Sequence, residues 1–99
     1  MKFIYLKNYL DLSREEKLNF FKFLSNADNI SIVHQKVIFG ENALLLDFKE
    51  DTNIEEVKKT IESFFQTIPK ISVHVVHQII QNKESLILEF NHKKLRIKQ

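Results

Sequence analysis

The first residues of the chain alternate between two faces in the manner of a β-strand, and both faces are apolar. Successive side chains on a strand point to opposite sides. Residues 2–9 therefore place Ile4 and Leu6 on one face and Phe3, Tyr5 and Tyr9 on the other. One face is expected in a core with helices, and the other face needs a second partner.

Two helices are predicted from capping signals followed by apolar residues at helical spacing. Ser13 with Glu16 forms a capping box, and so does Thr52 with Glu55. The first helix is expected to run to about residue 26. Its apolar positions are Leu18, Phe21 and Leu24, and those of the second helix are Ile54, Val57, Ile61, Phe64, Phe65 and Ile68 before Pro69.

Each helix is followed by a predicted β-hairpin. The first hairpin joins 29–39 to 43–48 across a short polar turn, and the second joins 71–81 to 85–90. The basic tail, 91–99, alternates apolar and charged residues, which favours a partly ordered edge strand over a free solvated end.

These elements predict one domain, 1–99, with the order β-α-β-β-α-β-β. Right-handed β-α-β crossovers place both helices on one face of a single antiparallel sheet, so the predicted fold is a ferredoxin-like α+β sandwich with an added C-terminal strand. The residues expected to face the helices are Ile4, Leu6, Leu44, Leu46, Phe48, Leu86, Leu88 and Phe90. The open face is expected to carry Phe3, Tyr5, Tyr9, Leu45 and Ile87.

The stretches 13–48 and 52–90 resemble each other. Val33-His34-Gln35 aligns with Val76-His77-Gln78, and Phe48 aligns with Phe90. An internal duplication of an αββ unit explains the similarity, and shared composition is the alternative. If the units are duplicates, aligned side chains should occupy equivalent faces.

The composition excludes several classes of function but assigns none. The 99 residues include no Cys, so disulfides, thiol catalysis and thiolate zinc sites are excluded, and a cytoplasmic location is expected. The apolar run 3–6 is too short to span a membrane. A net charge of +2 permits an anionic partner without requiring one.

The first strand also resembles one element of a known domain family. Ile4, Tyr5, Leu6 and Asn8 match the aliphatic, aromatic, aliphatic, any, Asn pattern that opens the RNA-recognition motif, and Tyr9 stands where Leu is usual. The resemblance implies a ferredoxin-like fold in which Tyr5 stacks on a base of single-stranded RNA.

The third predicted strand departs from that family. Ala43 and Leu45 occupy the positions of its two stacking aromatic residues, although Leu46 and Phe48 match core positions. Nucleic-acid contacts would then rest on Tyr5 and on the basic tail. The candidate phosphate contacts in the tail are Lys93, Lys94, Arg96 and Lys98.

Catalytic and metal-binding patterns are not apparent in the sequence. His74 and His77 point to opposite faces of a regular strand, and no serine lies on a glycine-flanked turn. His34 and His77 are expected as partly buried imidazoles. We therefore predict no enzyme activity, no cofactor and no metal.

The sequence favours a small non-enzymatic protein-interaction module. Its apolar sheet face or a free edge strand would bind a second copy, giving a homodimer, or a larger protein that it regulates or inhibits. The alternative is a single-stranded RNA- or DNA-binding domain that uses Tyr5 and the basic C-terminal tail.

Overall fold

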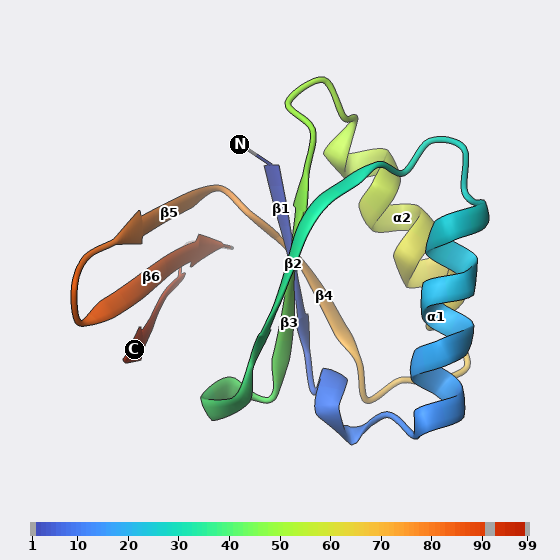
Figure 1. Ribbon diagram of the computed structural model, residues 1–99, viewed down its shortest axis with the longest axis horizontal. Helices are drawn as coiled ribbons and strands as arrows, with labels where there is room; N and C mark the ends of the chain where they lie inside the picture. The colour runs from blue at the N-terminus through green and yellow to red at the C-terminus, as the bar shows by residue number, and fades with distance from the viewer. Residues whose placement is uncertain (1, 91–92, 99) are drawn as a thin grey trace.

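The computed structural model describes residues 2–90 and 93–98, and within them two α-helices, a four-stranded sheet and a three-stranded sheet form three layers (Figure 1). The elements are β1 (Lys2–Lys7), the 3-10 helix η1 (Tyr9–Asp11), α1 (Arg14–Asn26), β2 (Ile32–Ile38), the 3-10 helix η2 (Phe39–Glu41), β3 (Ala43–Phe48), α2 (Ile54–Phe64), β4 (Ser72–Val76), β5 (Gln78–Gln81), β6 (Ser85–Phe90) and β7 (Lys93–Lys98). Sheet A has the order β2-β3-β1-β4, and sheet B has the order β5-β6-β7. The protein is α+β, and both sheets are antiparallel.

Strand β1 occupies the interior of sheet A. Ile4 lies opposite Leu46 of β3 and Val75 of β4. Ile4 and Leu6 point into the core beneath the helices, whereas Tyr5 belongs to a second core on the other face. The edges of sheet A are therefore β2 and β4.

The helix-side core contains the residues of β1 and β3 that alternation predicted, namely Ile4, Leu6, Leu44, Leu46 and Phe48. Phe20 of α1 is fully buried, and its ring centroid lies 4.8 Å from that of Phe65, which follows α2. The prediction that Leu18 faces this core is wrong, because Leu18 is 54% exposed. Residues two apart on a helix point in nearly opposite directions, so the burial of Phe20 and Leu24 leaves Leu18 in solvent.

Both helix starts carry side-chain caps. The Ser13 hydroxyl accepts a hydrogen bond from the Glu16 amide at 3.1 Å, and the Glu16 carboxylate accepts one from the Ser13 amide at 2.7 Å. These bonds confirm the first capping box and lower the pKa of Glu16. The cap of α2 is Asn53 rather than Thr52, because the Asn53 side chain accepts a hydrogen bond from the Glu56 amide at 3.3 Å.

The predicted strand 71–81 is divided at His77. The pairing of β4 with β1 ends with Val76 opposite Phe3, and the His77 amide then donates to the Glu89 carbonyl of β6 at 2.8 Å. This bond lies at the point where the chain leaves sheet A and enters sheet B. The prediction of one continuous sheet is therefore wrong.

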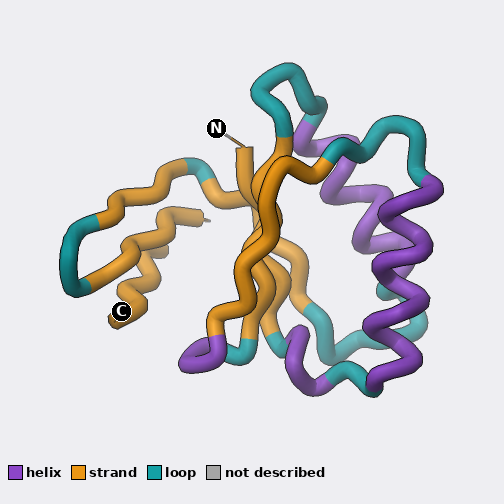
Figure 2. Tube along the Cα trace, in the orientation of Figure 1, coloured by secondary structure: helices purple, strands orange, loops and turns teal. Residues whose placement is uncertain are grey.

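Sheet B packs against the face of sheet A that the helices leave uncovered (Figure 2). Leu86, Leu88 and Phe90, which we expected beneath the helices, instead belong to this second core. Alternation correctly grouped them on one face. It did not identify the surface that covers them, because both faces of sheet A are apolar.

The two halves of the chain do not share one architecture. β2 and β3 are neighbours in sheet A, whereas β4 and β6 belong to different sheets. Phe48 packs beneath the helices and its aligned counterpart Phe90 packs between the sheets. The faces expected to be equivalent under a duplication are therefore not equivalent.

Candidate functional site

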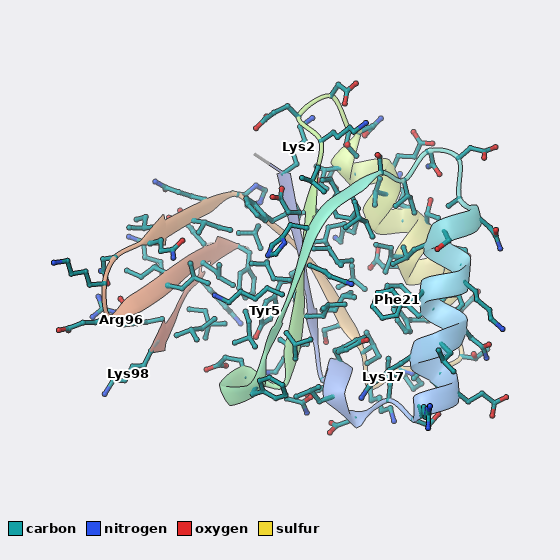
Figure 3. The ribbon with its side chains drawn as sticks, viewed as in Figure 1. Lys2, Tyr5, Lys17, Phe21, Arg96 and Lys98 are labelled. Atoms are coloured by element: carbon teal, nitrogen blue, oxygen red, sulfur yellow. The ribbon has the colours of Figure 1, made fainter. Side chains whose placement is uncertain are left out.

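The apolar face predicted to bind a partner is covered by the chain's own second sheet. Tyr5 is 1% exposed and Leu45 is 7% exposed. The Tyr5 ring lies between the two sheets, and its centroid is 5.4 Å from that of Phe90 (Figure 3). The expectation that this face is open is wrong, because Phe90 and its neighbours in sheet B occupy it.

The remaining members of the predicted face are dispersed. Phe3 is half-buried at the border of the second core, and Ile87 is half-buried in β6. Tyr9 lies in the helix-side core instead, because the left-handed Asn8 backbone, with φ of 66°, ends β1 and starts η1. Lys17 lies over the Tyr9 ring, with its ammonium nitrogen 5.5 Å from the centroid.

Most of the basic tail forms β7, a strand at the edge of sheet B, as predicted for residues 93–98. Ile97 is buried against sheet A, so its side of β7 faces inward. Alternation places Lys94, Arg96 and Lys98 on the other side. Figure 3 shows Arg96 and Lys98 at the periphery of the molecule. Residues 91, 92 and 99 of the predicted tail lie outside the described residues.

The more exposed edge of sheet A is β2. Its four central residues, 33–36, are exposed, whereas β4 at the other edge has no fully exposed residue among its five. The register between β2 and β3 shifts between Ile32 and His34, and the intervening Val33 is 61% exposed. Such an exposed edge carries backbone donors and acceptors that can pair with another strand.

A groove runs beside this edge. It has a volume of about 440 Å³ and is lined by Phe21, Leu24 and Ser25 of α1, by Ile30, and by residues 32–35. Phe21 points from α1 toward the strands (Figure 3). The groove places apolar side chains next to the exposed backbone of β2, which is the combination that strand-addition sites use.

The two basic residues of β2, His34 and Lys36, lie on the side of sheet A that faces sheet B. His34 lies opposite Asp47 and Lys36 lies opposite Leu45 of β3. Leu45 belongs to the second core, which identifies the side on which Lys36 lies. Lys36 therefore has an apolar cross-strand neighbour in β3, and β2, as an edge strand, has no strand of the described residues on its other side.

A second cavity, of about 400 Å³, is bordered by both sheets near Tyr5 and His74. Burial, and secondarily the negative charge of Glu41, raise the pKa of Tyr5 to about 12. Burial also lowers the pKa of His74, with further lowering from Lys58, Lys7 and Lys93. His74 is therefore neutral near neutral pH.

No protein-family model matches the chain, and neither the curated proteins nor the solved structures include a significant match.

The described residues include neither a metal-binding cluster nor a membrane-spanning helix. No cluster of three or more His, Asp or Glu side chains suited to a metal ion occurs among them. In the same residues, no helix is long and apolar enough to cross a membrane.

Sequence reasoning missed two features of these sites. Val33 and the groove beside it depend on the edge position of β2, which strand order alone determines. The cavity near Tyr5 combines Lys7 with Lys93, from opposite ends of the chain. Only the alternation of His74 with Val73 and Val75 hinted that this histidine lies on the Tyr5 side.

Proposed function

We propose that this protein is a small non-enzymatic interaction module that binds an extended segment of a partner protein along the free edge of β2. The observation that carries the proposal is the position of Val33 and the rest of this exposed edge beside the groove lined by Phe21 and Leu24. Main-chain hydrogen bonds to a sheet edge supply affinity, and pockets for alternate side chains supply specificity.

The arrangement of sheet A and the helices supports a ferredoxin-like unit. The strand order β2-β3-β1-β4 and the placement of both helices on one face are the arrangement expected of that fold. In this proposal sheet B is an addition that covers the second face, so the edge of β2, and not the face of the sheet, receives the partner.

The charges on β2 favour a partner segment that alternates acidic and apolar residues. Acidic side chains would lie beside Lys36 and His34, and apolar side chains on the opposite face would enter the groove. An antiparallel two-fold pairing with a second copy centred on residue 35 or 36 is less favourable, because it sets Lys36 against His34 or Lys36 of the other copy.

The test is a titration of the full chain with two short peptides, one alternating Glu and Val and one alternating Lys and Val, followed by amide chemical shifts. The Glu peptide should perturb residues 33–37 and bind more tightly than the Lys peptide. Lys36→Glu should reverse this preference, whereas Lys22→Glu, on the exposed side of α1, should not.

A substitution in the groove tests the apolar contribution. Val33→Asp should weaken the binding of the Glu peptide by about tenfold or more, because it places a carboxylate at the apolar edge. Leu18→Asp is the matched control, since Leu18 is also an exposed apolar residue but lies away from the groove. Light scattering should show a monomer; a dimer that Val33→Asp dissociates would identify a second copy as the occupant. Equal effects of the two substitutions would contradict the proposal.

A second candidate function is nucleic-acid binding through β7. The observation that favours it is the row formed by Lys94, Arg96 and Lys98 on one side of an edge strand. Phe90 covers Tyr5, so the Tyr5 ring is not available to stack on a base. The three basic side chains of β7 would therefore hold the nucleic acid. Arg96→Gln should then weaken the binding of a labelled single-stranded oligonucleotide. It should also reduce the salt dependence of that binding by about one phosphate contact. Unchanged binding in this variant would exclude the β7 row.

A further inference from the structure

The cavity near Tyr5 is enclosed by residues from both sheets. Sheet A contributes Tyr5 and Lys7 of β1 with Ser72 and His74 of β4, and sheet B contributes Phe90 of β6 and the start of β7. Its volume of about 400 Å³ lies in the range of small-molecule sites, roughly 300 to 1,000 Å³. A ligand in it would contact both sheets.

The charged side chains that line this cavity are mostly basic. They are Lys7, Lys93 and Lys94, with Glu41 as the single acid. Lys93 lies on the inward side of β7 and Lys94 on the outward side, so Lys7 and Lys93 are the lysines that face the cavity, and they outnumber Glu41. Basic side chains that converge on a concave site raise the local concentration of anions.

The wall of the cavity is aromatic and closely packed. The ring centroids of His74 and Phe90 are 5.0 Å apart, and those of Tyr5 and Phe90 are 5.4 Å apart. Tyr5 is almost completely buried, so its position is held by packing. Such a packed wall is already ordered before a ligand binds, which lowers the cost of binding.

Charges from several elements act on this region. Lys7 and Lys93, from different sheets, both lower the pKa of His74, which indicates that both ammonium groups lie within electrostatic reach of its ring. Lys58 acts in the same direction and Glu62 acts against it, both from α2. Glu41 acts on Tyr5 instead.

We propose that this cavity is a binding site for a small anion bearing phosphate or carboxylate groups, with Lys7 and Lys93 holding the negative charge between the two sheets. The site is separate from the edge of β2 and does not depend on the function proposed there. Because the ligand would contact both sheets only when they are docked, it would stabilise their packing.

The experiment follows His74 in the full chain by NMR while inorganic phosphate or malonate is added. Chloride at the same ionic strength is the reference. A specific anion favours the protonated imidazole, so the pKa of His74 should rise with phosphate or malonate relative to chloride. The stronger of the two responses identifies the phosphate or the carboxylate class.

Substitutions assign the response to the two lysines. Lys7→Gln and Lys93→Gln should each weaken binding by about tenfold or more, because each removes a charge-assisted hydrogen bond. Both side chains are exposed, so neither change should disturb folding, and Lys22→Gln is the control for lost charge elsewhere. Equal weakening in all three variants, or a His74 pKa that responds alike to chloride, phosphate and malonate, would overturn the proposal.

Discussion

The ring of Tyr5 stacks on the ring of Phe90, with centroids 5.4 Å apart and planes inclined by 25°. Tyr5 lies in the interior of sheet A and Phe90 closes the end of β6 in sheet B, so this contact joins the two sheets. It also accounts for the apolar second face of β1. Side chains that would bind a partner in an open sheet here form a second core.

Loss of the Tyr5 ring should destabilise the whole protein. Tyr5→Ala removes a fully buried aromatic side chain and should lower the free energy of unfolding by about 3 to 5 kcal/mol, as for other buried aromatic residues. Tyr5→Phe keeps the ring and should cost much less. Urea unfolding measures both. Equal, small changes would show that sheet B does not cover this residue.

Leu88 and Leu18 form a matched pair that tests the burial of sheet B. Leu88 is fully buried and Leu18 is 54% exposed. Leu88→Ala should cost about 2 to 5 kcal/mol, whereas Leu18→Ala should change stability by no more than about 0.5 kcal/mol. Thermal unfolding compares the two. A Leu88 variant as stable as the Leu18 variant would indicate that sheet B is not part of the cooperative core.

The start of α2 provides a test of capping by neighbouring residues. Asn53→Ala should cost about 1 kcal/mol, because it removes the acceptor for the Glu56 amide. Thr52→Val keeps the shape of the side chain and removes only the hydroxyl, so it should cost less. Chemical denaturation measures both losses of stability. A larger loss in Thr52→Val than in Asn53→Ala would show that Thr52 is the cap, as the capping-box pattern predicted.

Alkaline pH should weaken the fold through Tyr5. Burial, followed by the charge of Glu41, raises its pKa from 10.0 to about 12 in the folded protein. The folded state binds this proton more tightly than the unfolded state, so the contribution is complete below pH 10 and is lost as the pH rises from 10 toward 12.

The comparison that isolates this effect is between the wild-type protein and Tyr5→Phe. Wild-type stability should fall relative to the variant over that interval, as measured by denaturant unfolding at each pH. Tyr9→Phe serves as the control for the other tyrosine, whose pKa burial also raises. A difference between wild type and Tyr5→Phe that does not vary with pH would contradict the assignment.

The sequence by itself determined the features that depend on near neighbours along the chain. The capping box at Ser13 places the start of α1, because its two hydrogen bonds join residues three apart. Alternation in 43–48 correctly separated Leu44 and Leu46 from Leu45. The edge strand predicted from the alternating tail is present as β7.

Only the tertiary structure decided which surfaces these elements cover. Alternation groups Leu86, Leu88 and Phe90, but it cannot choose between two apolar faces of sheet A, since either one buries the same side chains. The change of sheet at His77 makes that choice. The same docking buries Tyr5 and brings Lys7 and Lys93 to one cavity, whereas the strand order of sheet A leaves β2 at an edge. Long-range contacts and not local spacing determine which distant residues meet.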